Sequence, residues 1–374
     1  MPRVASRLSL PLLAAAMLTG TPLLAQETTT IGGYGEVHYV NPSGANTPAE
    51  VNFRRFIVYL SHSFNDRITF RSELEVEDAK IEGGAAGGEV ALEQAFLDYR
   101  VHDNVTLRTG LVLPPIGIIN ETHEPPTFNG VDRPAFDHDV LPTTWREIGV
   151  GIMGPLKVAE GLNYRLYLLN GLRSDGFSGE EGIRGGRQEG REATFANPSL
   201  TGRLEWVRPG LRIGGSFWYG GTTGGNLALG DGTFDAPMAL FSADARYELD
   251  GFSARAVVAT ISIDADTINA VYGNGVGSRI SGGYLEGAYD LLRVLSPGSS
   301  QRLNAFVRHE RFDTHADVPT GVTRDRELAR RITTLGLSYK PTWNTIFKGD
   351  YEIRRTAAGT AEGETLRLGV GYQF

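Results

Sequence analysis

The chain has 374 residues and a formal net charge of −8 at pH 7, with 44 acidic and 36 basic residues. This acidic balance disfavours nucleic acid as a partner, and the absence of cysteine excludes both a disulfide framework and a thiolate metal site. No linker or low-complexity tract divides the sequence, so we expect one large sheet-built domain over residues 26–374.

Residues 1–25 have the organisation of a secretory signal peptide. Two arginines precede an apolar run from Leu8 to Leu18, and the small residue Ala25 stands before the predicted cleavage point. The run is too short to cross a bilayer as a helix, and no later stretch approaches the ~20 apolar residues that such a helix needs. The exported chain is therefore expected to be either soluble or inserted in a membrane as a β-barrel.

Alternation of apolar and polar residues with a period of two recurs along the rest of the chain and predicts β-strands. It is clearest from Ile68 to Glu77, where apolar side chains at even positions oppose charged side chains at odd positions. Most of the predicted strands are close to the ~9 to 11 residues that a tilted strand needs to cross a bilayer. They run over 29–39, 53–63, 68–77, 89–101, 105–113, 147–154, 162–170, 199–207, 211–219, 238–249, 252–263, 280–291, 302–312, 330–339, 345–355 and 364–374.

The connections between these strands alternate between short and long, which is typical of outer-membrane barrels with short periplasmic turns and longer external loops. Aromatic residues gather beside the short turns and are expected to form an interface girdle. They are Tyr99, Trp206, Tyr247, Phe252, Tyr289, Tyr339, Phe347, Tyr372 and Phe374. These features predict an all-β, transmembrane antiparallel β-barrel of about 16 strands with both termini on the periplasmic side. A soluble β-sandwich is the alternative.

The last predicted strand ends the chain on an aromatic residue. From Leu366 to Phe374 apolar residues alternate with polar residues or glycine, so one face is expected to meet lipid and the other the lumen. This pattern resembles the signal by which outer-membrane barrels are recognised for insertion, which would make Tyr372 and Phe374 contacts of the barrel-assembly machinery. On this register Leu368→Arg should destabilise the barrel, and Arg367→Leu should be tolerated.

The polar faces of the predicted strands carry basic and acidic residues in nearly equal numbers. Because a charge in a dry interior loses several kcal/mol of hydration unless it is well paired, this pattern favours a water-filled channel. A plugged barrel, in which the charges pair with one another, is the alternative. The residues assigned to the pore wall are Arg71, Glu73, Glu75, Asp98, Arg100, Arg108 and Arg165.

Residues 114–146 form the longest connection, which is rich in proline and contains Phe128, Phe136 and Trp145. This composition predicts an ordered segment, and as the third external loop it is expected to fold inward and narrow the pore. Acidic residues outnumber arginines in it, so we expect a weak cation preference that fades at high salt. A solvated surface lid is the alternative. The residues assigned to the constriction are Glu121, Glu124, Asp132, Arg133, Asp137, His138, Asp139 and Arg146.

Two histidines in this connection lie near carboxylates in the sequence. His138 stands between Asp137 and Asp139, and His123 stands near Glu121 and Glu124. Adjacent residues cannot all converge on one ion, and no helical spacing of histidines supports a zinc site. The sequence therefore predicts no metal site and no cofactor, and it offers no paired nucleophile and base that would predict catalysis.

The run LEQAFLDYRVHDNVTLRTGLVLPPIG at residues 92–117 resembles the phosphate-selective porin O and P family. The segments GLNYRLYLLNG and ITTLGLSYKPTWNTIFKGDYEIRR are similar to later parts of the same family. The resemblance implies a sixteen-stranded, usually trimeric channel with an inward-folded third loop. The chain departs from the family's pattern because its long loop is acidic and lysine is nearly absent, so the resemblance does not extend to phosphate specificity.

These observations predict a passive porin of the bacterial outer membrane that contacts lipid, forms a homotrimer and passes small hydrophilic solutes or ions. The alternative within this class is an anion or phosphate channel. From other classes, the alternatives are an outer-membrane barrel enzyme and a structural adhesin.

Overall fold

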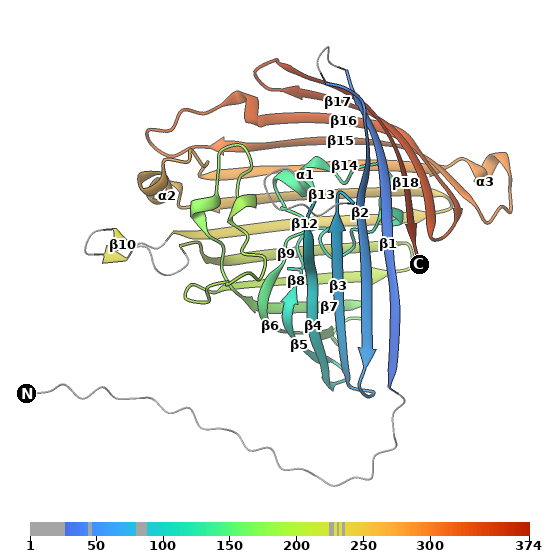
Figure 1. Cartoon of the computed structure of the whole chain (residues 1–374), viewed down its shortest axis with the longest axis horizontal. Coiled ribbons are helices and arrows are strands. Elements are labelled where there is room, and N and C mark those ends of the chain that lie inside the picture. Colours follow the sequence, from blue (N-terminus) through green and yellow to red (C-terminus); the bar gives the residue numbers. More distant parts are fainter. Residues whose placement is uncertain (1–26, 44–46, 80–87, 224–227, 230–231, 234–235) are drawn as a thin grey trace, which may run out of the picture.

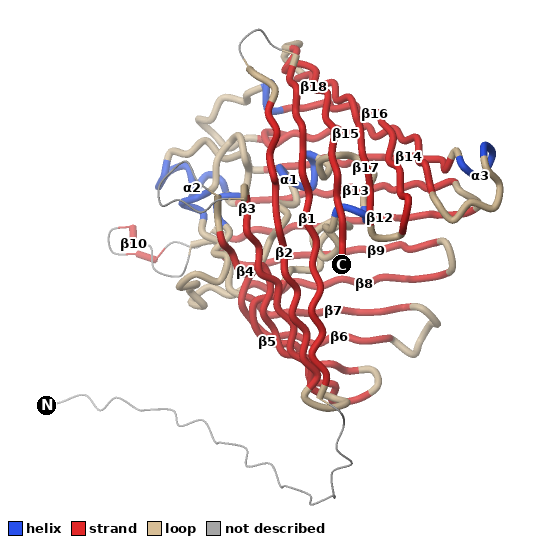
Figure 2. The backbone as a smooth tube through the Cα atoms, turned by 45° about the vertical axis from the view of Figure 1, so that its right-hand side comes forward, coloured by secondary structure: helices blue, strands red, loops and turns tan. Residues whose placement is uncertain are grey.

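In the computed structural model the chain forms one closed β-barrel (Figures 1 and 2). The structure describes residues 27–43, 47–79, 88–223, 228–229, 232–233 and 236–374, so the predicted signal peptide at 1–25 lies outside the described residues. The sixteen strands of the barrel are β1 (Thr28–Pro42), β2 (Glu50–Ser63), β3 (Ile68–Glu77), β4 (Val90–His102), β5 (Val105–Val112), β6 (Glu147–Pro155), β7 (Leu162–Leu169), β8 (Ser199–Arg208), β9 (Leu211–Gly221), β12 (Pro237–Leu249), β13 (Phe252–Ile263), β14 (Arg279–Asp290), β15 (Arg302–Asp317), β16 (Ala329–Thr342), β17 (Thr345–Thr356) and β18 (Ala361–Gln373). A separate two-stranded sheet contains β10 (Ala228–Leu229) and β11 (Gly232–Thr233).

The barrel closes by antiparallel pairing of its first and last strands, β1 and β18. Their register runs from Tyr34 opposite Gln373 to Pro42 opposite Thr365. Backbone groups of Phe374 and Gly33 exchange two hydrogen bonds, of 2.8 and 2.9 Å, so the last residue takes part in closure. Closure satisfies the strand edges that an open sheet would expose. The predicted all-β antiparallel barrel is confirmed.

The longest connections lie at one end of the barrel, which we call the loop end, and most of the tight turns lie at the other, which we call the turn end. Turns such as 103–104 and 209–210 occupy the turn end, and the connections 113–146 and 170–198 start from the loop end. No helix within the described ranges is long and apolar enough to cross a membrane. The helical segments are η1 (Pro125–Thr127), α1 (Ala135–Asp139), η2 (Ser174–Gly176), η3 (Arg184–Gly186), α2 (Ala265–Tyr272), α3 (Leu292–Leu295) and η4 (Arg326–Leu328).

The outer surface of the barrel is apolar, as the alternation in the sequence predicts. In β18, Leu368 is 49% exposed on the outside, whereas Arg367 is 4% exposed on the inside. Several of the predicted girdle residues are neighbours across strands: Phe252 is opposite Tyr289, and the rings of Tyr339 and Phe347 stack. A closed barrel with an apolar exterior and aromatic residues near its turns belongs in a bacterial outer membrane.

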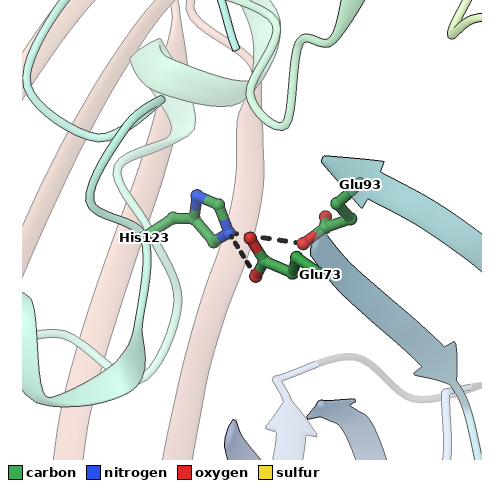
Figure 3. A group of neighbouring side chains, drawn as sticks. All are labelled: Glu73, Glu93 and His123. Atoms are coloured by element: carbon green, nitrogen blue, oxygen red, sulfur yellow. Dashed lines mark ion pairs between the residues drawn. The ribbon is translucent and has the colours of Figure 1, made fainter. Parts of the chain in front are cut away.

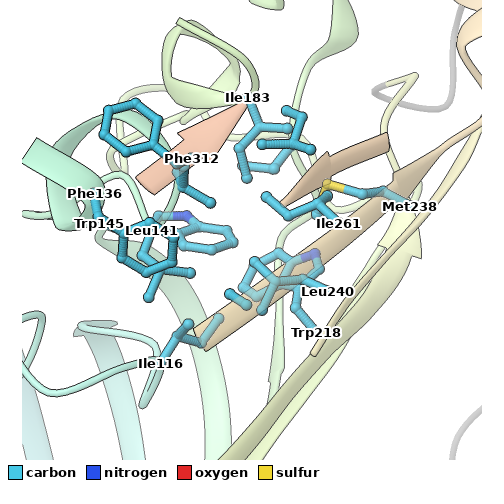
Figure 4. Close-up of a cluster of buried hydrophobic side chains, with 14 of the residues drawn as sticks. Ile116, Phe136, Leu141, Trp145, Ile183, Trp218, Met238, Leu240, Ile261 and Phe312 are labelled. Atoms are coloured by element: carbon cyan, nitrogen blue, oxygen red, sulfur yellow. The ribbon is translucent and has the colours of Figure 1, made fainter. Parts of the chain in front are cut away.

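The third long connection, residues 113–146, folds into the barrel, where Figure 1 shows its helix α1 surrounded by strands. Together with residues of the connection 170–198 and the loop-end halves of several strands, it forms an apolar cluster that we call the lumen core (Figure 4). At its centre the rings of Trp145 and Trp218 lie 4.3 Å apart. Labelled members are Ile116, Phe136, Leu141, Trp145, Ile183, Trp218, Met238, Leu240, Ile261 and Phe312.

The lumen core corrects the expectation of a lumen lined by polar residues throughout. Met238 and Leu240 point inward and are fully buried, whereas their neighbour Phe241 is 60% exposed on the outside. The loop-end half of β12 is therefore apolar on both faces, and alternation cannot show which face an apolar row covers when the other face is apolar too. The loop-end half of this side of the lumen is therefore dry.

Candidate functional site

Hydrogen bonds to the barrel wall hold the inward loop across the lumen. The backbone N–H of Val131 donates to Asp350 on β17 at 2.6 Å, and that of Phe136 donates to Glu310 on β15 at 2.8 Å. Lys348 on β17 donates to the carbonyl oxygen of Gly130 at 2.7 Å. Buried charged residues of the wall thus find partners in the loop backbone, which explains how an irregular segment is stable inside a membrane barrel. The predicted inward fold of the loop is confirmed.

The acidic residues of the loop are compensated by basic residues of the wall. Asp132 lies 3.0 Å from Arg367 and 3.4 Å from His38. Asp139 lies 2.9 Å from Arg330 and 2.7 Å from its neighbour His138. Burial alone would raise the pKa of Asp139, but contacts with His138 and Arg330 hold this pKa below its ordinary value.

Asp137 behaves differently because its side chain is fully buried. Neither of its carboxylate oxygens accepts a hydrogen bond from a described residue, and burial raises the pKa of Asp137 to about 8. The carboxyl is therefore mostly neutral at pH 7. Together with the ion pairs of Asp132 and Asp139, this removes the uncompensated negative charge that the composition of the loop suggested.

The remaining residues assigned to the constriction also have partners. Glu121 lies 3.4 Å from Arg165 on β7, and Glu124 accepts a hydrogen bond of 3.4 Å from Tyr59. Arg146 pairs with Glu189 at 3.3 Å. Arg133 donates to the carbonyl oxygen of His123 at 3.2 Å and forms no ion pair with any described residue.

The residues assigned to the pore wall separate into two groups. Arg108 and Asp98 form a bidentate pair with both bonds at 2.8 Å, and the guanidinium of Arg108 covers the ring of Phe96 at 3.8 Å. Arg100 instead lies at the turn end, where it is exposed and donates to the carbonyl oxygen of Asp66. Assignment of Arg100 to the wall away from the rim is therefore wrong, because parity gives the face of a strand but not the height of a residue along it.

Several cavities border the inward loop. Two of them, of about 370 and 530 Å³, lie at the turn end beside β12 and β13, and the other two lie beside β1–β4. The vestibule, of about 590 Å³, opens toward the loop end, and its lining includes Glu36, Arg55, Glu75, Asp132 and Arg367. The turn-end cavity, of about 300 Å³, is lined by residues that include Arg71, Glu73, Gln94, Arg108, Glu121 and His123. Both spaces carry side chains of both charge signs.

Between these spaces the loop meets β3 and β4 in a cluster of three buried ionisable residues, Glu73, Glu93 and His123 (Figure 3). Nε2 of His123 lies 3.4 Å from Glu73 and 3.3 Å from Glu93. Burial lowers the pKa of His123, but the charge of Glu93 and contacts with both carboxylates raise it to about 10. A proton on His123 therefore balances part of the cluster's charge when no other cation is present.

Glu93 is the member of this cluster that sequence reasoning missed. Strict alternation in β4 places Gln94, Phe96 and Asp98 inside, and therefore Glu93 outside. In the structure Glu73 is opposite Gln94 but Leu74 is opposite Leu92, so a β-bulge leaves Glu93 as an extra residue and turns it inward. The charged Glu93 in an otherwise apolar row was the available signal. His123 meets Glu73 and Glu93 rather than Glu121 or Glu124, its neighbours in the sequence.

No family model matches the sequence. A protein of Aquifex aeolicus (strain VF5), known only as an uncharacterized protein, is 34% identical over 358 residues, which cover 92% of this chain and 80% of the relative. The chain belongs to the same family as this protein. Because this relative has no described activity, the family does not indicate what the chain does.

Solved structures similar to the chain are outer-membrane proteins. They include a loop-deletion mutant of OmpT, an outer membrane protein of Vibrio cholerae (10% identity, 93% of this chain and 99% of that chain, TM-score 0.59). The outer membrane channel DcaP of Acinetobacter baumannii (12%, 96% and 100%, 0.58) and an anion-selective porin from Comamonas acidovorans (11%, 93% and 100%, 0.57) are also similar. At these identities the likeness shows the porin fold alone, and the resemblance to phosphate-selective porins stays a prediction.

Proposed function

We propose that the chain is a passive outer-membrane channel for small hydrophilic solutes and ions, without catalysis. The observation that carries the proposal is the position of two polar cavities, the vestibule and the turn-end cavity, which border the inward loop beside β1–β4, where the lumen core does not reach. A path between them would be short, polar and narrowed by the loop. It would favour solutes that keep their hydration and would exclude apolar ones.

The charges that line the vestibule favour weak ion selectivity. Nine carboxylate residues and eight arginines contribute to its lining, and most of them form ion pairs. An uncompensated charge contributes only about 1 kcal/mol at ~4 Å in water, and physiological salt screens it over ~8 Å. Discrimination between cations and anions should therefore be modest and should decrease as salt increases.

Single-channel recording in planar bilayers tests the proposal directly. The purified, folded barrel should give steady conductance that rises with salt concentration. A barrel that inserts but gives no steady conductance would contradict the proposal and would favour a plugged barrel.

Charge variants of the loop then test the assignment of the path. Changing Asp132 and Asp139 to Asn leaves Arg367 and Arg330 without these partners, so the reversal potential in a salt gradient should move toward anion selectivity, most strongly at low salt. Asp137→Asn is the matched control, because this buried carboxyl is already mostly neutral at pH 7. An equal shift in the control would show that the path does not follow the vestibule.

An anion-selective channel is the second candidate, and two arginines favour it. Arg133 and Arg184 line the vestibule, and neither forms an ion pair with a described residue. Strong anion selectivity of the unmodified channel, lost in Arg133→Gln and Arg184→Gln, would support this candidate over the unselective one.

The proposed assembly is a homotrimer that contacts outer-membrane lipid. Support comes from a structure of Vibrio cholerae OmpT described as a trimer form, which is similar to the chain with a TM-score of 0.57. Light scattering of the detergent-solubilised protein, corrected for bound detergent, would show three chains per particle.

A further inference from the structure

We propose that Glu73, Glu93 and His123 form a binding site for a divalent transition-metal cation of the Zn²⁺ type. Two carboxylates and one imidazole are a donor set that suits Zn²⁺ and its first-row neighbours. This inference does not depend on whether the barrel conducts.

The three side chains converge on one point. Nε2 of His123 lies 3.4 Å from Oε1 of Glu73 and 3.3 Å from Oε2 of Glu93, and the ligand atoms of all three residues lie within 4.8 Å of one another. Two atoms bound to Zn²⁺ at ~2.0 Å in a tetrahedral arrangement are about 3.3 Å apart. Figure 3 shows Nε2 facing both carboxylates, which enter from β3 and β4.

The atoms that face this point lack hydrogen-bond partners in the structure. They are Oε2 of Glu93, Oε1 of Glu73 and Nε2 of His123. Glu93 is fully buried, and the side chains of Glu73 and His123 are 3% exposed. Buried carboxylates are normally hydrogen-bonded or coordinate a cation, so the unpartnered atoms indicate a missing ligand with positive charge.

Hydrogen bonds behind the ligand atoms orient two of the three side chains. Nδ1 of His123 lies 3.0 Å from the carbonyl oxygen of Asn120, which fixes a proton on Nδ1 and leaves Nε2 for an ion. Gln94 donates to Oε2 of Glu73 at 2.7 Å and leaves Oε1 facing His123. Such supporting contacts are typical of metal ligands, since they fix the tautomer and the ring orientation.

A second histidine of the lumen provides an internal comparison. His38 is also buried beside two carboxylates, with Nε2 3.2 Å from Glu36 and Nδ1 3.4 Å from Asp132. Because these acids lie on opposite nitrogens, they cannot share one ion with the ring. Both also have arginine partners, Arg55 for Glu36 and Arg367 for Asp132. The two clusters thus contain the same residue types, but only the carboxylates around His123 lie on one ring nitrogen, as a metal site requires.

The site can be reached from the lumen. Glu73, Gln94 and His123 line the turn-end cavity, which is large enough to admit a hydrated ion. A bound ion would also connect the inward loop, through His123, to β3 and β4. Metal binding should therefore raise the stability of the folded barrel by mass action.

The test uses the folded, full-length mature barrel, purified in detergent without a polyhistidine tag and stripped with a chelator. After equilibration with Zn²⁺ and removal of free metal, elemental analysis should find one zinc per chain, and titration calorimetry should give its affinity. His123→Gln and Glu93→Gln should each weaken binding at least ~10-fold, the lower range for loss of even a supporting contact. His38→Gln should bind as the unmodified protein does.

Two further readouts keep the test independent of folding defects in the variants. Heat-modifiable migration shows which variants are folded. In the unmodified barrel, Zn²⁺ should raise the midpoint of thermal unfolding, and Co²⁺ in its place should give the intense visible bands of a four-coordinate site. Absence of bound zinc in the unmodified barrel would overturn the proposal, as would equal binding by the folded His123→Gln and His38→Gln variants. Either result would leave the cluster as a protonated ion pair only.

Discussion

Replacement of Arg367 by leucine should destabilise the barrel strongly, although alternation in the sequence suggested that it would be tolerated. Arg367 on β18 is 4% exposed and contacts Asp350 at 2.9 Å, Glu352 at 2.5 Å and Asp132 of the inward loop at 3.0 Å. Its guanidinium is thus shared by two buried carboxylates of the wall and one carboxylate of the loop. A replacement would be tolerated at a lumen position in contact with water, but Arg367 is buried and pairs with three carboxylates.

The loss in free energy of unfolding depends on which carboxylates are left without a positive partner when Arg367 is replaced. Removing one partner of a buried ion pair costs about 3 to 5 kcal/mol. Asp350 and Glu352 are nearly inaccessible. Among the described residues Asp350 would keep only the hydrogen bond from the backbone N–H of Val131, whereas Glu352 would keep its ion pair with Arg354. Asp132 is 43% exposed and can be rehydrated, so its lost pair adds at most about 1 kcal/mol. A total near 4 kcal/mol is expected.

Guanidinium unfolding of the barrel in lipid vesicles measures this cost. Tryptophan fluorescence is a suitable signal because Trp145 and Trp218 are fully buried in the lumen core, with their rings 4.3 Å apart. Arg212→Leu is the matched control, since Arg212 on β9 is exposed to the lumen and forms no ion pair with a described residue; it should cost less than about 1 kcal/mol. Equal, small effects of the two replacements would refute the argument from buried carboxylates.

Three further outcomes are expected. Leu368→Arg, on the lipid face of the same strand, should cost roughly 2 to 4 kcal/mol near the bilayer midplane, measured by the same unfolding assay; tolerance would show that the register is wrong. Removal of Phe374, or Phe374→Ala, should reduce the folded, heat-modifiable protein in the outer membrane without blocking export, because Phe374 pairs with Gly33 at the closure; an unchanged amount would contradict an assembly role. Asp137 has a raised pKa of about 8, so this carboxyl should lower the stability of the barrel as pH rises from ~4 to ~8, by ~1.4 kcal/mol per unit at most. Asp137→Asn should remove this contribution, so that stability falls less steeply with pH than in the unmodified barrel, and parallel pH profiles of the two proteins would disprove it.

The sequence by itself determined the barrel. Each membrane-crossing strand must present apolar side chains to lipid, so the alternation of residues such as Leu366, Leu368 and Val370 records strand, face and register. The alternation of short and long connections predicted an even number of strands, and the aromatic residues of the last strand predicted that it pairs on both sides in a closed barrel. Proline and aromatic content also predicted an ordered third loop, because a local composition of this kind restricts the backbone whatever surrounds it.

Only the tertiary structure decided which charges and apolar faces meet across the lumen. The ion pair of Asp132 with Arg367 joins residues 235 positions apart, and the cluster of His123 with Glu73 and Glu93 joins a loop to two strands. Alternation cannot reveal such contacts, because it gives the face of each residue and not its height or its partner. A β-bulge even reverses the face, as at Glu93. The dry lumen core had the same cause: Met238 and Leu240 are apolar in a strand whose outer face is apolar too, so only packing against the inward loop shows that both faces are covered.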